Sequence, residues 1–360
     1  MEQQLTEGES KALTTKCTGC GADFAYDIET GMLKCAHCGS TKAIEKDETV
    51  VRRQITSDVI KQCSEWKEAT VFNCNNCGAK EVFERKEISR KCCFCGSTNI
   101  VATSELAGVR PDSVIPFQIT KDSAIHRFRK YIKSKLFAPK NFKKADLNER
   151  INALYSPCWS FSANTENAYN GTLGRTVYHH HRDSRGQTIT TTSINWFRVW
   201  GQINQNYQDF FVQSGSQIPP ITFNKLMPFN IKLVTVYRQE YLSGIIAEHY
   251  SKNLETCFNS FAQSVRLDIR RRVMNKYRAD HVQFMDIQTN YKSRKFNYVL
   301  LPLYIANYTY KNKTYNFYVN GASGAIVGKY PKSKLKISLL VLGSITLVAG
   351  IGVGIFFAML

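Results

Sequence analysis

Four Cys-x-x-Cys-Gly motifs constrain the fold of this 360-residue chain more than any other feature. They form two sets of four cysteines, and an offset of 57 residues without a gap relates one set to the other. A gap-free repeat of this kind indicates the duplication of one small unit. The two sets are Cys17, Cys20, Cys35 and Cys38, followed by Cys74, Cys77, Cys92 and Cys95.

Each set matches the ligand pattern of a structural zinc site. One Cys-x-x-Cys turn presents two thiolates to an ion, and two such turns complete a tetrahedron of sulfur ligands. The chain begins with a polar, acidic segment instead of an apolar secretory signal, so we expect reduced thiols that bind metal. A redox pair would explain one motif, but four copies in a duplicated frame favour metal. The sequence therefore predicts two small, tandem β zinc ribbons, each with one structural Zn²⁺ and no open catalytic position.

The remaining cysteines fit neither set. Free cysteine usually behaves as a small buried hydrophobic side chain. We expect this of Cys63, Cys93, Cys158 and Cys257.

The net charge of +19 is unevenly distributed along the chain. Residues 1–108 carry 14 Lys/Arg and 16 Asp/Glu, whereas the rest carries 34 Lys/Arg and 13 Asp/Glu. Each zinc–thiolate centre adds a charge of about −2, so the metallated ribbon half would carry about −6. Such a charge is poorly suited to phosphate contacts, and nucleic-acid binding by the ribbons is therefore not favoured.

The body, residues 113–330, is predicted to be α+β with mostly antiparallel sheet. Apolar residues recur at helical spacing over 121–136, and the segment 242–277 predicts one long helix or two. Aromatic and β-branched residues predict strands over 151–170, 188–212, 281–287, 298–310, 314–320 and 325–328. A faint similarity between residues 157–161 and 302–306 hints at an internal duplication of the body.

The last 24 residues, 337–360, contain no charged side chain. As a helix they would span about 36 Å, enough to cross a hydrocarbon core of about 30 Å. They therefore predict one C-terminal transmembrane helix and a single-pass protein of the cell membrane. Lysines just before the segment predict cytoplasmic N-terminal domains by the positive-inside rule, and they would contact an anionic lipid surface. These lysines are Lys329, Lys332, Lys334 and Lys336.

The predicted organisation follows from these features. A connecting segment between the ribbons has apolar spacing compatible with a helix. The segments are a polar tail (1–16), ribbon 1 (17–41), the connecting segment (42–73), ribbon 2 (74–98), a linker (99–112), the body (113–330), a Lys-rich juxtamembrane segment (331–336) and the transmembrane helix (337–360).

Signals for catalysis are weak. The stretch from Gly324 to Lys329 is one residue short of a P-loop, and Tyr330 replaces the Ser/Thr that would hold magnesium. A run of three histidines at 179–181 has no spaced carboxylate or cysteine beside it. No nucleophile–base signature is present. The chain is therefore predicted not to be an enzyme and to have no catalytic residues.

The ribbon duplication resembles the TFIIB-type double zinc-ribbon membrane proteins of Gram-positive bacteria. So do the stretches VIPFQITKDSAIHRFRKYIKSKLFAPKNFK, LSGIIAEHYSKN and FYVNGASGAIVGKYPKSKLKI. The resemblance implies a membrane adaptor in envelope stress, with a flotillin-like (SPFH) or phage-shock-protein-A-like partner. No nucleotide-binding motif accompanies the ribbons, which argues against helicase activity.

We therefore expect a non-catalytic, membrane-anchored zinc-ribbon scaffold that recruits protein partners at the cytoplasmic face of the membrane. The first alternative is a membrane-tethered nucleic-acid-binding protein with a role in replication or transcription. The second is a membrane-surface enzyme, which a convergent polar cluster in the body would favour.

Overall fold

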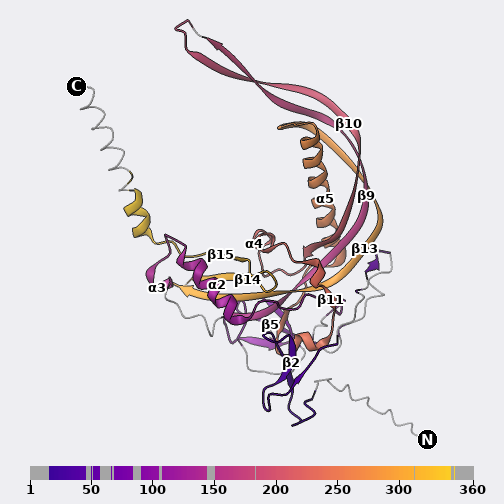
Figure 1. Ribbon diagram of the computed structural model, residues 1–360, viewed down its shortest axis with the longest axis vertical. Helices are drawn as coiled ribbons and strands as arrows, with labels where there is room; N and C mark the ends of the chain where they lie inside the picture. Colours follow the sequence, from indigo (N-terminus) through magenta and orange to yellow (C-terminus); the bar gives the residue numbers. More distant parts are fainter. Residues whose placement is uncertain are drawn as a thin grey trace.

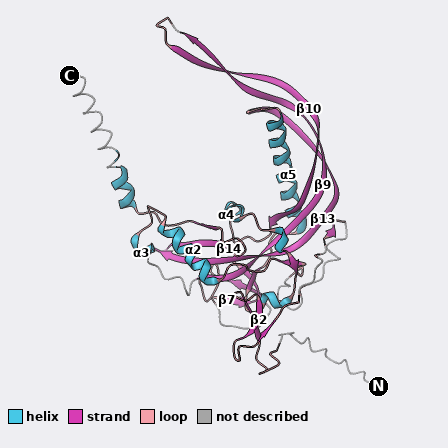
Figure 2. Ribbon diagram, in the orientation of Figure 1, coloured by secondary structure: helices cyan, strands magenta, loops and turns pink. Residues whose placement is uncertain are grey.

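The computed structural model describes residues 16–45, 50, 52–56, 66, 69–83, 91–104, 108–143, 151–182, 184–311, 313–341 and 344. Within these residues the chain is mostly β-structure with few helices, as Figure 2 shows. The strands form one three-stranded sheet and one twelve-stranded sheet. The large sheet builds a base, and three of its strands continue from that base as a long, curved arm (Figure 1).

The small sheet is the first ribbon. Its antiparallel strands are β1 (Phe24–Asp27), β2 (Met32–Cys35) and β3 (Thr41–Lys42), in the order β1-β2-β3. This ribbon is packed on the base: the Tyr26 amide donates to the Ser243 carbonyl at 2.9 Å. The Ser243 hydroxyl in turn donates to the Phe24 carbonyl at 2.7 Å. The rings of Tyr26 and Tyr241 also meet edge to face, with centroids 5.5 Å apart.

The second ribbon is part of the large sheet. Its strands are β5 (Thr70–Cys74), β6 (Lys80–Phe83) and β7 (Ile100–Ala102). Strand β6 pairs with β12 (Ile246–Glu248), and β12 pairs with the long strand β9 (Ile151–Arg182). The ribbon therefore extends the sheet of the body by direct backbone hydrogen bonding.

Three long antiparallel strands form the arm: β9, β10 (Thr188–Gln213) and β13 (His281–Tyr310). Helix α5 (Leu254–Lys276) packs along one face of these strands, as Figure 1 shows. Its N-terminus is capped by the Asn253 side chain, which accepts from the Thr256 amide. Its buried side chains follow helical spacing: Leu254, Cys257, Phe261, Val265, Ile269 and Val273.

Two bulges lie in the outer strands at a similar level of the arm. The ladder slips between Tyr207 and Phe210 in β10, and between Lys292 and Lys295 in β13. Bulges increase local twist and bend a strand, and they account for part of the curvature of the arm. At the first bulge Asp209 has a φ of 46°, and Arg52 holds its carboxylate with two hydrogen bonds of 2.9 and 2.7 Å.

The base and arm are built from two related halves. The first runs β8 (Ser113–Val114), α2 (Lys121–Lys133), β9 and β10, and the second runs β12, α5, β13 and β14 (Lys313–Asn320). Strand β8 pairs in parallel with β13, just as β12 pairs in parallel with β9. The central strands β9 and β13 pair antiparallel, and each also pairs with a short strand of the other half. These pairings relate the halves by an approximate twofold axis near the Ser156–Leu301 pair. The faint repeat between residues 157–161 and 302–306 lies on either side of this axis, which supports the predicted duplication.

The remaining elements complete the base. They are α3 (Lys140–Lys143), α4 (Pro220–Leu226), β4 (Arg53–Gln54), β11 (Thr235–Val236), β15 (Ile326–Gly328) and the 3₁₀ turns Ile231–Leu233 and Gln239–Leu242.

The predicted fold class, β ribbons plus an α+β body plus a transmembrane helix, is wrong. The structure is mostly β because β9 and β13, of 32 and 30 residues, extend well beyond the strands predicted at 151–170, 281–287 and 298–310. The strand predicted at 188–212 is confirmed as β10. Of the segment 242–277, only α5 is α-helical, and β12 occupies part of the remainder. The helix predicted at 121–136 is confirmed as α2, which the Thr120 side chain caps.

The predicted transmembrane helix and single-pass membrane location also need correction. No helix in the described part of the chain is long and apolar enough to cross a membrane. The described residues of this region are helical only from 334 to 341 and at 344. The rest of the predicted span, residues 342, 343 and 345–360, lies outside the described residues. Much of the connecting segment 42–73, including Cys63, lies outside them as well, and its described part holds β4 and the start of β5.

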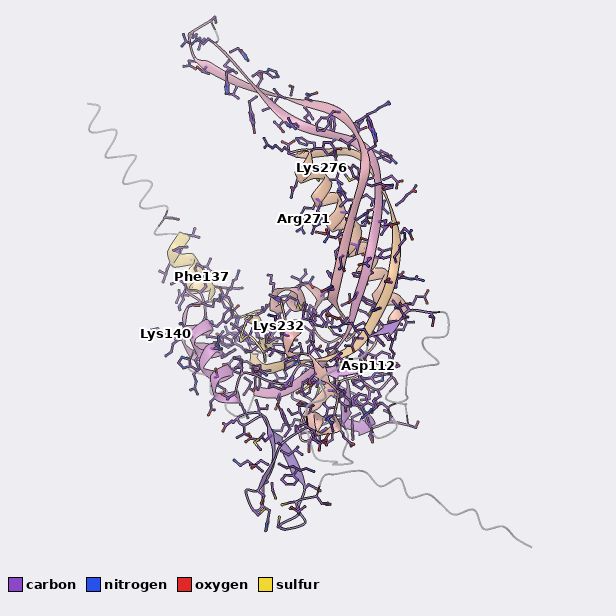
Figure 3. The ribbon with its side chains drawn as sticks, turned by 45° about the vertical axis from the view of Figure 1, so that its right-hand side comes forward. Asp112, Phe137, Lys140, Lys232, Arg271 and Lys276 are labelled. Atoms are coloured by element: carbon purple, nitrogen blue, oxygen red, sulfur yellow. The ribbon has the colours of Figure 1, made fainter. Side chains whose placement is uncertain are left out.

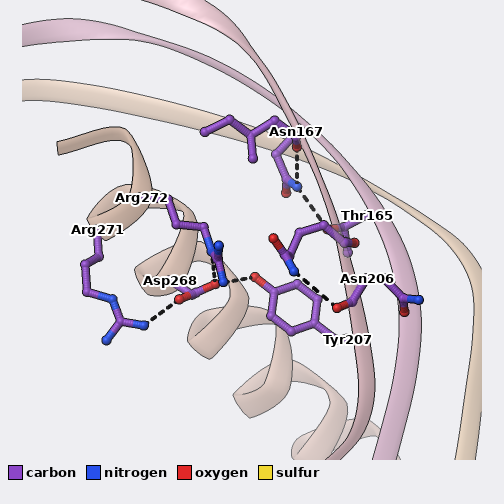
Figure 4. A network of polar contacts seen from close by, with 9 residues as sticks. Thr165, Asn167, Asn206, Tyr207, Asp268, Arg271 and Arg272 are labelled. Carbon is purple, nitrogen blue, oxygen red and sulfur yellow. Dashed lines mark hydrogen bonds and ion pairs between the residues drawn. The ribbon is translucent and has the colours of Figure 1, made fainter. Parts of the chain in front are cut away.

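A polar network fastens α5 to the arm. Asp268 accepts hydrogen bonds from the Tyr207 hydroxyl of β10 at 2.8 Å, from Arg272 at 2.7 Å and from Arg271 at 2.6 Å (Figure 4). Replacing Asp268 by Asn is expected to lower the free energy of unfolding by about 1 kcal/mol, because the amide loses the charge-assisted bonds at this partly exposed site. Urea denaturation of a double-mutant cycle with Tyr207→Phe measures the coupling. Strictly additive effects of the two changes would contradict the network.

Candidate metal centres

The first four-cysteine group lies between two tight turns of ribbon 1. The Cys17 and Cys38 sulfurs are 3.5 Å apart, as are those of Cys20 and Cys35. All four ligand atoms lie within 4.8 Å of one another. Cys17 and Cys35 are buried, whereas Cys20 and Cys38 are exposed. The ligands therefore converge on one point near the surface.

The second group has the same construction in ribbon 2. Its closest sulfur pairs, Cys74 with Cys95 and Cys77 with Cys92, are 3.7 Å apart. These four sulfurs also lie within 4.8 Å of one another. The glycines that follow the second cysteine of each turn adopt φ values of 70° to 76°, which favours glycine over other residues. They are Gly21, Gly39, Gly78 and Gly96.

Local hydrogen bonds favour the thiolate form of the last cysteine in each group. Hydrogen bonds from the Ser40 side chain and backbone lower the pKa of Cys38 to about 6. Burial acts to raise the pKa of Cys95, but hydrogen bonds from Asn76 and Ser97 outweigh it and lower that pKa to about 7. Thiolates, not thiols, are the ligands of a metal ion.

The geometry fits zinc. Zn–S bonds of about 2.3 Å in a tetrahedron place the sulfurs about 3.8 Å apart, close to the distances found in both groups. Sulfurs 3.5 to 3.7 Å apart are not disulfide-bonded. The fold thus brings together the four cysteines of each predicted set, and each of the two groups can hold one metal ion. Four protein ligands close the coordination sphere, as in structural zinc sites.

The other described cysteines are not ligands. Cys93, Cys158 and Cys257 are fully buried, as predicted. Cys93 lies next to the ligand Cys92, but its thiol points to Glu81 and donates to that carboxylate at 3.2 Å. Burial raises the pKa of Cys93 well above its usual value, which keeps it a neutral thiol.

Two buried carboxylates, which the sequence did not reveal, lie where ribbon 2 joins the body. Glu81 of β6 and Glu248 of β12 are direct cross-strand partners, and both side chains are buried. The Cys93 amide donates to Glu81 at 3.0 Å, and the Gln217 amide donates to Glu248 at 2.9 Å. Burial raises the pKa of Glu248 to about 7, despite hydrogen bonds that favour its charged form. Their only sequence signal is an alternating position in two short strands, which does not distinguish a buried glutamate from an exposed one.

The four lysines predicted to contact lipid are not equivalent. Lys336 donates to the carbonyls of Leu136 and Ala138 at 3.1 and 2.8 Å, and so ties the start of the C-terminal helix to the segment after α2. That segment includes Phe137, which Figure 3 labels. Lys334 is exposed. Lys329 and Lys332 line a cleft beside β14.

The face of the arm turned away from α5 carries a row of exposed large side chains. Ile194, Trp196 and Trp200 lie at alternating positions of β10 and therefore share a face. Thr172 of β9 pairs with Arg198 of β10 on one side and with Phe284 of β13 on the other, so Phe284 lies on that same face. Leu173 and Val199 of the opposite face are buried in the core that contains α5. We call the set Tyr178, Ile194, Trp196, Trp200 and Phe284 the aromatic row; 75% of Trp200 and 63% of Tyr178 is exposed.

Comparison with known proteins supplies a relative of nearly the same extent. The chain is 30% identical over 329 residues to YdjG of Bacillus subtilis (strain 168), across 91% of this chain and 92% of that protein. The chain belongs to the YdjG family. YdjG is itself described as uncharacterized, so membership of its family assigns no activity. No family model and no solved structure matches the chain, and the wider TFIIB-type designation therefore remains an expectation.

Proposed function

We propose that the chain is a non-catalytic, zinc-stabilised adaptor that binds a protein partner through the aromatic row of its arm. The metal centres support this role because four cysteines each would leave no open position for chemistry. In this role zinc stabilises ribbons that are too small to supply a sufficient core of their own.

The aromatic row is the observation that carries the proposal. Monomeric proteins seldom expose several large apolar side chains together, and such patches usually mark interaction sites. Tryptophan, tyrosine and arginine contribute most of the binding energy at protein interfaces. Here Arg198 lies between Trp196 and Trp200 on the same face, and His281 packs beside Trp196 with ring centroids 6.3 Å apart. These features fit an apolar partner surface with acidic groups around it.

Trp196 and Trp200 provide the test of this docking face. Changing both to Ala is expected to weaken partner binding at least 30-fold, since a central aromatic anchor contributes about 2 kcal/mol or more. Purified flotillin-like and phage-shock-protein-A-like proteins, the classes that the family resemblance implies, are the first partners to titrate. The control changes Ile221 and Leu267, which are exposed on α4 and α5, to Ala.

Equal affinities for the double-tryptophan variant, the control and the unaltered chain would contradict the docking face. Aromatic side chains with nearby arginines can also stack on single-stranded nucleic acid. Titration with a single-stranded oligonucleotide therefore belongs in the same experiment. Tight binding that falls steeply with salt and requires Trp196 and Trp200 would replace the protein-adaptor proposal by the nucleic-acid alternative.

A further inference from the structure

A cleft of about 750 Å³ opens beside the edge of the large sheet, and neither the aromatic row nor a metal-ligating cysteine lines it. Strand β14, the turn that leads into α4, and the segment that follows β15 form its walls. Its volume lies in the usual range for small-molecule sites. We call it the lysine cleft, after Lys313, Lys329 and Lys332 in its lining.

The charge of the lysine cleft is all of one sign. Lys313 comes from the start of β14, whereas Lys329 and Lys332 follow β15. No aspartate or glutamate lines the cleft. None of the three lysines has an ion-pair partner in the portion of the chain that the structure describes. Three cations around one cavity repel one another unless an anion lies between them.

The rest of the lining is suited to more than a bare ion. Tyr315 and Tyr330 contribute ring surface and hydroxyl groups, and Thr222 of α4 adds another hydroxyl. Tyr318 borders the cleft from the other face of β14. Tyr318 is almost fully buried, which gives the cleft a fixed wall. Tyr330 is packed against the core cluster that also contains Phe128 and Phe317. Aromatic walls with a few polar groups are typical of sites for small organic ligands.

Pairing in the sheet explains why these residues meet. Strand β14 pairs with β15 as far as Phe317 and Gly328. Beyond that point the described structure has no ladder pairing between the two segments, and residues of both segments border the cleft. The β14–β15 hairpin thus brings Lys313 to one cavity with Lys329 and Lys332, which follow it by 16 and 19 residues in the sequence.

We propose that the lysine cleft binds an organic phosphate, with the phosphate group among the three lysines and the organic portion against the tyrosines. Lysine is a flexible point charge that commonly binds phosphate oxygens. The phosphate can belong to a small metabolite or to a lipid headgroup, since both offer the same doubly bonded and anionic oxygens beside an organic group. This inference is independent of the aromatic row and of the metal centres.

Titration calorimetry of the full, metal-loaded chain with p-nitrophenyl phosphate tests the proposal. We expect saturable binding of one molecule per chain, tighter than that of inorganic phosphate because the ring contacts the tyrosines. The variant Lys313→Gln/Lys329→Gln/Lys332→Gln should bind at least tenfold more weakly. The matched control, Lys121→Gln/Lys130→Gln/Lys140→Gln, removes the same charge from exposed positions on α2 and α3 and should retain the affinity of the unaltered chain.

Metal content and melting temperature verify that both triple variants are folded. The single change Lys329→Gln provides a milder test, and we expect it to weaken binding two- to fivefold. Competition by phosphatidylglycerol vesicles, but not by phosphatidylcholine vesicles, would support a lipid headgroup as the source of the phosphate. Binding that vesicles do not affect would support a free organic phosphate. No saturable binding, or an equal loss of affinity in the two triple variants, would overturn the proposal.

Discussion

Removing the second metal centre is expected to unfold much of the base, whereas removing the first should unfold little beyond its own ribbon. Cys74→Ser/Cys77→Ser and Cys17→Ser/Cys20→Ser should each reduce the zinc content from two ions per chain to one. Apparent binding free energies of structural zinc in small peptides are about 10–16 kcal/mol, comparable to the whole stability of a domain. The location of each ligand set therefore decides how far the damage extends.

The difference between the two centres has a clear structural cause. Cys74 ends β5, whose neighbours β6 and β12 connect it to the long strand β9. Core packing does not separate the two centres: Cys92 lies in one core cluster with Leu154 of β9, and Cys17 lies in another with Tyr155 of the same strand. Backbone pairing does separate them. Ribbon 1 forms a sheet of its own and is attached to the base by packing and a few hydrogen bonds.

Elemental analysis and thermal unfolding followed by circular dichroism measure both effects. We expect the melting temperature of the base to fall by more than 10 °C in the ribbon 2 variant and by only a few degrees in the ribbon 1 variant. Cys257→Ser, a change at a buried cysteine outside both groups, should retain two ions. Zinc near zero in reduced, metal-replete protein would refute both centres, and equal losses of stability would refute the difference between them.

The second large effect concerns pH and the buried Glu248. Its pKa is about 7 in the folded chain, above the value of about 4.3 expected in the unfolded chain. The folded state therefore retains a proton that the unfolded state has lost between these values. Glu248 therefore contributes most to the free energy of unfolding below about pH 4, and this contribution declines as the pH rises to about 7. At 1.36 kcal/mol per pKa unit, the total decline is about 4 kcal/mol.

Replacing Glu248 by Gln should remove this dependence. The amide oxygen can still accept from the Gln217 amide, and the residue carries no charge beside Glu81. We expect the free energy of unfolding of the variant, relative to the unaltered chain, to rise by about 3 kcal/mol between pH 4.5 and 8. Denaturation at fixed free zinc measures it, with the exposed Glu29→Gln as the control. Parallel pH profiles for all three proteins would show that Glu248 is not protonated in the fold.

Local chemistry in the sequence determined the metal sites, one helix and two of the strands: β10 and β14 agree to within one residue with the ranges predicted at 188–212 and 314–320. Eight cysteines in a gap-free repeat specify two tetrahedral sets because each Cys-x-x-Cys turn is complete within a few residues. The apolar spacing and threonine cap of α2 are local too, and the helix appeared where it was predicted. The same holds for the burial of Cys93, Cys158 and Cys257, which follows from side-chain polarity.

Only the tertiary structure decided the rest. Strand β9 continues to Arg182 because β10 pairs with it to the end, although its last residues are polar and exposed. Glu81 meets Glu248, Trp196 lies on the same face as Phe284, and Lys313 shares a cleft with Lys329 only after distant strands have paired. Pairing between strands far apart in the chain leaves almost no local signal, since either strand could satisfy its backbone with other partners. The cysteine sets needed no such partner, and for that reason they could be predicted from the sequence alone.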